Sequence, residues 1–358
     1  MMQTRGVENV ILSVQMDPRI SIDKITNAFF HLREYDRPGY LLIRYHGWCP
    51  PRRGKVSLDW WKKLAMVGVR KVVEQNGPFD LVHAHTYWAQ YLASEIDREY
   101  GIPFITTEHS AIHLPGILRT FHRQLIPGAA QGAKILHCAS RGMQTGLKEV
   151  YRRDFELLPL PVDTVFFSKG LKKRKFTNSD FPVFLSIGAP WKTKGFDTLI
   201  LAFSMVKKQS LPGAVLRIGD KIPGREKLDS LAADLGVKDS VEWLGPLTKY
   251  GVRNAFEGAD IYVSASRYES FNRTIPEAMA AGLPVISTQT YGPVDYLKPF
   301  CGLLVSADNP PAMADAMTEM ARNTNRYNRK KISDYVSENF STGVLSNEFF
   351  NMYTRALC

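Results

Sequence analysis

Two glutamates in the second half of the chain have the spacing and context for binding a hydroxylated, negatively charged ligand. Glu269 and Glu277 have seven residues between them. A β-branched run precedes the loop at residues 267–273 and a helical pattern follows it, so we expect this loop between a strand end and a helix start. N–H groups at a helix start can bind phosphate oxygens. The Glu269 carboxylate can accept hydrogen bonds from hydroxyl groups.

Glu277 also has a purely structural explanation. Thr274, Pro276 and Glu277 form the pattern of a capping box, with Thr274 as the N-cap and Glu277 as the third helical residue. Either the carboxylate caps its own helix or it binds a ligand. Replacement of Glu277 by Gln would separate these two interpretations.

Glycine-containing turns end three other strand-like runs of the second half. Their candidate ligand-binding residues are Gly188, Lys192, Lys194, Gly219 and Gly245. A lysine in such a loop can stabilise the charge of a diphosphate; the alternative is a solvated lysine in the first turn of a helix. Gly219 and Gly245 are weaker indications, because glycine is favoured in any such turn.

Histidines and a glutamate end two strand-like runs of the first half. His83 and His85 lie on one face at strand spacing, and Glu108 and His109 follow the next run. A metal site has to be considered, but no HExxH motif or matching cysteine accompanies the histidines. Contact with a substrate, or simple packing in the fold, is the favoured interpretation.

Short β-branched runs alternate with helical patterns in both halves, which predicts α/β architecture with parallel sheets. Strands are expected at residues 9–15, 40–45, 81–84, 104–107, 135–138, 183–187, 214–219, 241–244, 261–265, 285–287 and 302–305. We expect two Rossmann-like domains facing a cleft, at residues 1–167 and 181–334, joined by a polar, basic linker at 168–180. A C-terminal helix at about 335–358 is expected to pack back on the first domain.

The segment at residues 261–296 reads IYVSASRYESFNRTIPEAMAAGLPVISTQTYGPVDY. It resembles the retaining, nucleotide-sugar-dependent glycosyltransferases of family 4, whose E-x7-E motif matches Glu269 and Glu277. The likeness extends from about Val7 to Ala321. It implies the GT-B fold, a UDP- or GDP-sugar donor, no metal in the chemistry, and transfer to an acceptor hydroxyl with retention of configuration.

The resemblance also implies roles for single residues. Glu269 and His109 would lie next to the reacting sugar, and Glu277 would bind ribose hydroxyls. The donor-binding residues would be Gly188, Lys192, Lys194, Gly219, Gly245, Ser270, Phe271, Asn272 and Glu277. The acceptor-side candidates are His83, His85 and Glu108. The implied acceptor is a growing glycan or lipid-linked glycan, as in bacterial capsule or lipopolysaccharide synthesis.

Four features depart from the family pattern. Ala189 stands where the family has an arginine, Leu160 stands where it has an asparagine, and Tyr291-Gly292-Pro293 replaces its usual Gly-Gly. Residues 4–14 align with the end of the family's first helix and its second strand, so one initial βα unit of ~30 residues is expected to be missing. A second hypothesis is therefore a truncated, non-catalytic remnant that binds a nucleotide sugar or a partner protein.

Composition and charge limit the remaining classes of function. The 358 residues are 44% hydrophobic and carry a formal charge of +11, which excludes wholesale disorder. The charge divides into +5 up to Val165 and +6 beyond it (21 basic against 16 acidic residues, then 25 against 19). No nucleic-acid-reading motif accompanies it. We therefore expect no nucleic-acid partner.

A local basic cluster at residues 44–71 suggests an anionic membrane surface. Its basic residues are Arg44, Arg52, Arg53, Lys55, Lys62, Lys63, Arg70 and Lys71, interleaved with Trp48, Trp60 and Trp61. A solvated helix face with buried tryptophans is the alternative. The chain has no run of ~18 apolar residues and no signal-peptide pattern at its start, and its four cysteines are far apart. We expect a cytoplasmic protein, either free or peripheral at the inner face of the plasma membrane.

Overall fold

The computed structural model describes residues 8, 10–17, 30–37, 40–48, 55–110, 126–171 and 181–358. The expected linker from residue 172 to 180, Arg52, Arg53 and the first seven residues lie outside this part of the chain. The described residues divide into two compact units. The first lies within Met1–Cys138, Met143–Leu158 and Ser346–Cys358, and the second within Ala139–Gly142 and Pro159–Leu345.

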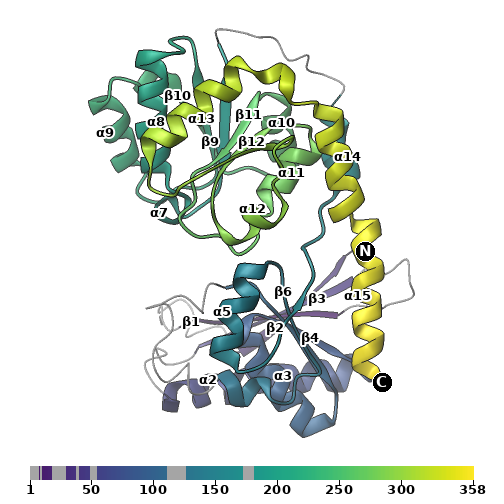
Figure 1. The fold of residues 1–358 in the computed structure, drawn as a ribbon. Helices are drawn as coiled ribbons and strands as arrows, with labels where there is room; N and C mark the ends of the chain where they lie inside the picture. The colour runs from purple at the N-terminus through teal and green to yellow at the C-terminus, as the bar shows by residue number, and fades with distance from the viewer. Residues whose placement is uncertain are drawn as a thin grey trace. The chain divides into compact units, whose positions relative to one another are not determined.

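Two sheets form the first unit (Figure 1). One has the order β1-β3-β2 and consists of β1 (Val10–Asp17), β2 (Phe30–Arg37) and β3 (Tyr40–Trp48). The other is parallel, with the order β4-β5-β6-β7, and consists of β4 (Val82–His85), β5 (Phe104–Glu108), β6 (Ile135–Cys138) and β7 (Glu156–Leu157). Its helices are α2 (Lys55–Asn76), α3 (Thr86–Tyr100), α5 (Arg141–Tyr151), which begins in the second unit, and α15 (Thr342–Leu357).

Apolar residues at helical spacing join α2 to α3. The buried side chains of this core are Trp61, Ala65, Met66 and Val69 on α2, and Tyr91, Leu92 and Ile96 on α3. Burial of each large apolar side chain contributes on the order of 2 kcal/mol. Helix α3 ends where Gly101 adopts the left-handed conformation, which glycine reaches without the steric cost of a side chain.

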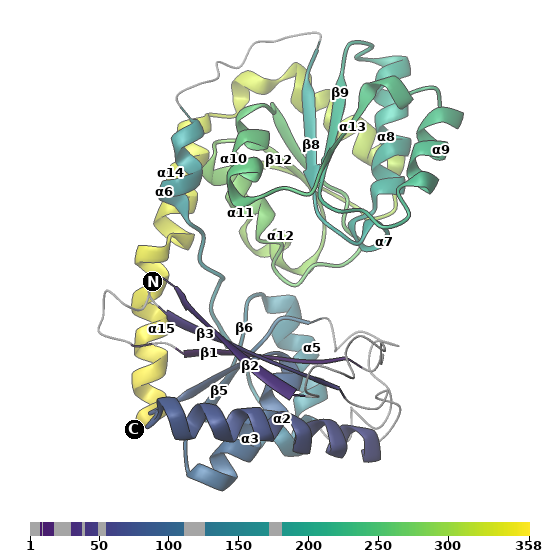
Figure 2. The ribbon, with the colours of Figure 1, turned by 180° about the vertical axis from the view of Figure 1, so that it is seen from behind.

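The second unit is built on one parallel sheet of six strands with the order β10-β9-β8-β11-β12-β13. The strands are β8 (Val183–Ile187), β9 (Val215–Gly219), β10 (Val241–Gly245), β11 (Ile261–Ser264), β12 (Val285–Thr288) and β13 (Gly302–Val305). Helices cover both of its faces, as Figures 1 and 2 show. They are α6 (Thr164–Phe167), α7 (Trp191–Lys194), α8 (Phe196–Gln209), α9 (Glu226–Asp234), α10 (Lys249–Glu257), α11 (Thr274–Ala280), α12 (Tyr291–Tyr296), α13 (Pro310–Arg322) and α14 (Arg329–Phe340).

The expected strands are present, with boundaries within three residues, but strand β2 and the two-residue strand β7 were not anticipated. The sequence of β2, FHLREYDR, is rich in charged residues and lacks the β-branched run used to find the others. It pairs antiparallel with β3, and the Pro38-Gly39 dipeptide between the two strands is the turn signal that could have revealed it.

The last helical stretch of the sequence is two helices rather than one. Helix α14 ends at Phe340 and α15 begins at Thr342. Between them the chain pairs with Val162, whose N–H donates to the Phe340 carbonyl at 2.8 Å and whose carbonyl accepts from the Thr342 N–H at 3.2 Å. These two bonds replace the helical bonds that would have continued α14. Within the described residues, no helix is long and apolar enough to cross a membrane.

Candidate active site

The strand order of the second unit reverses between β8 and β11. Successive strands run outward from β8 through β9 to β10 on one side, and from β11 through β12 to β13 on the other. In open parallel sheets, ligands bind outside the carboxyl ends of the strands at such a reversal. Gly188 directly follows β8, and the loop with Glu269 follows β11. Most of the candidates from the second half therefore lie at this one edge.

An ion pair between Lys194 and Glu269 is the central feature of this edge. The Lys194 Nζ lies 2.6 Å from Glu269 Oε1, and the side chains are 17% and 13% exposed. The Ser266 hydroxyl donates to the same Oε1 at 2.7 Å. The sequence suggested Lys194 and Glu269 as separate candidates, and only the structure brings them together.

Two glycines make room for this arrangement. A Cβ added to Gly188 would lie 2.5 Å from Lys194 Cε, and one added to Gly195 would lie 2.1 Å from the Ala265 carbonyl oxygen. Both residues have positive φ, +148° and +64°. Glycine at these positions lets Lys194 cross the end of β8 and lets α7 approach the end of β11.

Arg267 has a role that the sequence did not reveal. Its guanidinium donates to Asp308 Oδ1 at 2.7 Å, to Asp197 Oδ2 at 3.0 Å and to the Lys192 carbonyl. The hydrogen bond to Asp197 is the main cause of the raised pKa of Arg267. These bonds hold the base of the Glu269 loop against α7 and α8. Because the partners are 41 to 75 residues away, no local pattern marks them.

Lys192 stands apart from the ion pair. Its side chain is exposed, and its Nζ lies 5.6 Å from the centre of the Trp191 ring. The sequence suggested Lys192 as a candidate for binding the donor. In the structure its carbonyl oxygen anchors Arg267, and its ammonium group lies near Trp191.

The backbone at Phe271 and Asn272 is firmly held. The Tyr296 hydroxyl donates to the Phe271 carbonyl at 2.9 Å, and Gly292 approaches so closely that a Cβ there would lie 2.2 Å from the same oxygen. Asn272 is buried with φ of +60°. Glycine at position 292 therefore has a packing function here. Ser270 is half-buried in the same loop.

Glu277 does not form the capping box. The residue before α11 is Arg273, with helical dihedral angles and no side-chain capping bond, and Thr274 is already helical. The capping-box interpretation is therefore wrong, because the chain enters α11 one residue earlier than the motif requires. Burial raises the pKa of the Glu277 carboxyl, whose nearest cation is Arg273 at 3.7 Å.

The turns after β8, β9 and β10 lie next to one another. The Gly188 N–H donates to the Gly219 carbonyl at 3.1 Å, and the Asp220 N–H donates to the Gly245 carbonyl at 2.8 Å. A Cβ on Gly219 would lie 2.6 Å from Leu247 Cδ1. The three glycines that the sequence suggested thus form one continuous edge, and the requirement for glycine at 219 is steric.

The histidines of the first unit form a connected group at the ends of β4, β5 and β6. His85 Nδ1 and His109 Nε2 are 3.0 Å apart, and the ring of His85 stacks on that of His83 with centroids 4.3 Å apart. His83 contacts Tyr353 of α15 at 2.8 Å and Thr107 at 2.6 Å. Both of its ring nitrogens therefore have protein partners. In the described part of the chain, no group of three or more His, Cys, Asp or Glu side chains could hold a metal ion.

Glu108 is fully buried, at 0% exposure. Its Oε1 accepts from the Ser110 hydroxyl at 2.5 Å and from the N–H groups of His109 and Ser110 at 3.0 and 2.9 Å. Its Oε2 accepts from the Tyr151 hydroxyl at 2.9 Å. Burial raises the pKa of Glu108 despite these bonds. The carboxyl group thus holds the backbone that carries His109.

Comparison with known proteins supports a relationship over nearly the whole chain. The family model described as Glycosyltransferase Family 4 matches residues 2–166, and the model described as Glycosyl transferases group 1 matches residues 168–337. The chain is 26% identical over 273 residues to the D-inositol 3-phosphate glycosyltransferase of Frankia alni, covering 69% of this chain and 67% of that protein. It is 32% identical over 145 residues to the lipopolysaccharide core biosynthesis glycosyltransferase LpsE of Rhizobium meliloti, covering 40% and 41%.

Solved structures share the fold. Sucrose-phosphate synthase of Thermosynechococcus elongatus has a TM-score of 0.80 at 17% identity, covering 99% of this chain and 90% of that one. Anabaena HepE, solved in complex with UDP-glucose, has a TM-score of 0.71 at 16% identity, covering 96% and 99%. These likenesses confirm the expected GT-B fold. Together with the two family models, they show that the chain belongs to the family 4, or group 1, glycosyltransferases.

Proposed function

We propose that the chain transfers a sugar from a UDP- or GDP-sugar to an acceptor hydroxyl with retention of configuration. The observation that carries the proposal is the Lys194–Glu269 pair at the point where the strand order of the second unit reverses. Support for a nucleotide-sugar donor comes from HepE, a structural relative that was solved with UDP-glucose.

Each group at this edge has a chemical task in the proposal. When the bond between sugar and diphosphate breaks, negative charge grows on the diphosphate, and the Lys194 ammonium is placed to stabilise it. The Glu269 carboxylate accepts hydrogen bonds from sugar hydroxyls and so orients the reacting carbon. The main-chain amides at Phe271 and Asn272 bind the donor sugar, and Glu277 binds the ribose. We propose His109 as the group that orients the sugar or acceptor.

The proposed chemistry uses no covalent enzyme nucleophile, metal ion or cofactor. The donor phosphate assists removal of the acceptor proton on the face from which the diphosphate leaves. Positioning and fixed charge then supply the rate enhancement. Anomeric analysis of the product by NMR tests retention directly, since an inverted product would contradict this mechanism.

Substitution of Lys194 by Met tests the site. Removal of one charge-stabilising donor costs on the order of 100-fold in kcat, so we expect that loss in donor hydrolysis or transfer with UDP-glucose and a panel of GDP-sugars. Glu269→Gln is expected to lower kcat similarly. The matched control is Lys208→Met, an exposed lysine on α8, which should keep wild-type kcat and KM.

Binding of UDP and GDP by calorimetry separates the two functional hypotheses. Tight nucleotide binding with no turnover of any donor would contradict catalysis and favour the non-catalytic remnant. Ala189, in place of the family's arginine, is the observation behind that alternative. Turnover by the wild type that is unchanged in Lys194→Met would show instead that the reaction occurs elsewhere.

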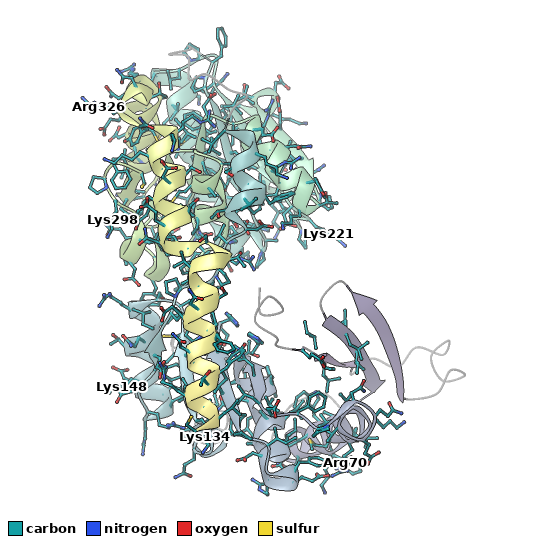
Figure 3. All side chains as sticks on the ribbon, turned by 90° about the vertical axis from the view of Figure 1, so that its right-hand side faces the viewer. Arg70, Lys134, Lys148, Lys221, Lys298 and Arg326 are labelled. Carbon is teal, nitrogen blue, oxygen red and sulfur yellow. The ribbon has the colours of Figure 1, made fainter. Side chains whose placement is uncertain are left out.

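We further propose a glycan or lipid-linked acceptor in bacterial surface polysaccharide synthesis, reached at an anionic membrane. LpsE, a lipopolysaccharide core glycosyltransferase, supports the polysaccharide part. On α2, Lys62 pairs with Glu95 at 2.7 Å and Arg70 with Glu99 at 2.6 Å; Figure 3 labels Arg70. Paired charges contribute little to membrane attraction, so the candidate surface is smaller than the sequence cluster.

The outer face of α2 keeps the features of a membrane contact. Trp60 is 55% and Val67 39% exposed, and Lys63 and Lys71 are exposed at helical spacing on the same face. Each basic residue near an anionic surface contributes about 1 kcal/mol. Reversal of the charge at both positions (Lys63→Glu with Lys71→Glu) should therefore lower the binding of the protein to vesicles rich in anionic lipid at least tenfold, as measured by sedimentation at low salt. Lys134→Glu serves as the control, and a wild type that does not sediment contradicts membrane binding.

A further inference from the structure

A chain of hydrogen bonds runs beneath the Glu269 loop. The Asn272 side-chain Nδ2 lies 2.9 Å from Ser264 Oγ, which lies 3.3 Å from Ser266 Oγ, which in turn lies 2.7 Å from Glu269 Oε1. Asn272, Ser264 and Ser266 are all buried, at 6%, 4% and 1% exposure. A ligand at the edge of the sheet would therefore meet Glu269 but not the hydroxyl of Ser264.

With the Asn272 Nδ2 at one end and the Glu269 carboxylate at the other, every bond in this chain has one direction. An amide NH₂ group only donates, and a carboxylate only accepts. The Ser264 hydroxyl therefore accepts from Asn272 and donates to Ser266. The Ser266 hydroxyl accepts from Ser264 and donates to Glu269. All the protons point toward the carboxylate, an arrangement in which each bond strengthens the next.

The same chain closes the loop on itself. Residues 266 and 272 lie near the two ends of the loop that carries Glu269, and Ser264, the last residue of β11, bonds to both. Asn272 has φ of +60°, a conformation that costs a non-glycine residue free energy unless its surroundings hold it. From β12, the Thr288 hydroxyl also donates to the Ser266 carbonyl at 2.5 Å. Ser264 is thus attached to a rigid strand and joined to both ends of the loop.

We propose that Ser264 is a positioning residue for the transfer reaction, which acts through Ser266 to hold the Glu269 carboxylate in its productive orientation. The proposal rests on the proposed function. Loss of the Ser264 hydroxyl would leave Ser266 without its incoming hydrogen bond and Asn272 Nδ2 without an acceptor. The carboxylate would then be less well oriented, while the residues that bind the nucleotide would remain. The expected effect is on kcat more than on the KM for the donor.

The neighbouring strand supplies a matched control. Ser287 is the register partner of Ser264 in the β11–β12 pair, it is fully buried, and its hydroxyl donates only to the Thr288 carbonyl at 3.0 Å among the bonds described. Ser264→Ala and Ser287→Ala therefore remove the same group from equivalent buried positions. We expect similar losses of Tm in the two variants, but a loss of kcat of about tenfold or more only in Ser264→Ala.

Ser264→Thr keeps the hydroxyl and is expected to restore most of the lost kcat. Equal kcat in Ser264→Ala and Ser287→Ala would overturn the proposal. The proposal would also be overturned if Ser264→Thr restored the Tm lost in Ser264→Ala but did not restore its kcat. If Glu269→Gln lowers kcat and Ser264→Ala does not, the proposed function stands and the positioning role falls.

A measurement on unfolding keeps the proposal testable in the absence of turnover. If no donor is turned over by the wild type, the proposed function fails first, and the double variant Ser264→Ala with Glu269→Gln then decides the positioning role. Residues in one hydrogen-bond network give non-additive effects on stability. We expect the two Tm shifts not to add in this pair, and to add when Ser287→Ala replaces Ser264→Ala. Additive shifts in both pairs would overturn the connection.

Discussion

Glycine at position 188 determines where the charged groups of the candidate site can lie. Its missing side chain leaves the space that the Lys194 stem occupies on its way to Glu269. The sequence marks Gly188 as a turn residue, and the structure adds a steric requirement. At the scale of single residues, the positions without side chains are therefore as important to the site as the charged ones.

Gly188→Ala is expected to displace Lys194 from Glu269. The new Cβ would lie 2.5 Å from Lys194 Cε, and the lysine side chain can move away because it is flexible. Donor turnover should fall toward the level of Lys194→Met, and stability should fall by about 1–3 kcal/mol because of the positive φ. Urea unfolding and steady-state kinetics measure the two effects.

Gly236→Ala is the control for this substitution. Gly236 also has positive φ, +69°, but nothing lies within 4 Å of an added Cβ. It should lose stability to a similar degree and keep full activity. Unchanged activity in Gly188→Ala would show that contact between Lys194 and Glu269 is not needed for the reaction.

At the scale of elements, a second hydrogen-bond chain joins β4, β5, β6 and α15. The His137 Nε2 lies 2.6 Å from the Leu158 carbonyl, which can only accept. A neutral His137 therefore accepts from Thr107 at its Nδ1, at 2.8 Å. His83 then donates to Thr107 from its Nε2 and accepts from the Tyr353 hydroxyl. Both histidines are neutral in this pattern of donors and acceptors.

Burial produces that neutral state. It is the largest cause of the lowered pKa of His83, and it lowers the pKa of His137 to about 4. Protonation would place a second donor on His137 and leave the Thr107 hydroxyl without its acceptor. We therefore expect the hydrogen-bond chain from His137 to Tyr353 to rearrange on protonation.

We expect the first unit to lose stability as the pH falls from 6.5 to 4. In this window the unfolded chain binds protons at His83 and His137 that the folded chain does not. The free energy of unfolding therefore becomes smaller as the pH falls. For His137 alone the loss approaches about 3 kcal/mol near pH 4. Glu108 acts in the opposite direction, because its pKa is raised in the folded state.

Urea unfolding at several pH values, in the wild type and in His137→Gln, checks this expectation. Glutamine can still donate to the Leu158 carbonyl but does not titrate. The variant should therefore show a shallower dependence of unfolding free energy on pH between 4 and 6.5. An identical dependence in the two proteins would contradict the assigned role of His137.

At the scale of the whole molecule, the two units carry different parts of the proposed chemistry. The second unit holds the ion pair and the glycine turns, whereas the first holds the histidines and Glu108. The two family models also divide the chain, at residues 166 and 168. The formal charge of +11 is a sum over the whole chain, whereas individual lysines are neutralised locally by glutamates, as in Lys62–Glu95 and Lys194–Glu269. Net charge is therefore a poor guide to what either unit binds.

The sequence by itself determined the class of fold and most of the candidate residues. Alternation of β-branched runs with helical patterns predicts parallel α/β units, because strand and helix periods are local properties of the chain. The spacing of Glu269 and Glu277 identified the family for a similar reason, since both lie in one short segment. Strand β2 was not predicted because its sequence is rich in charged residues and it pairs antiparallel. Helices α14 and α15 were predicted as one helix because Val162, whose hydrogen bonds separate them, is far away in the sequence.

Only the tertiary structure decided which of these residues act together. Lys194 and Glu269 are 75 residues apart, and His83 and Tyr353 are 270 apart, distances over which no sequence pattern specifies a contact. The capping-box interpretation of Glu277 was wrong because the exact start of α11 depends on how Arg273 and the buried loop before it pack. Contacts of this kind follow from how strands are ordered in the sheet, and that order is a property of the folded chain.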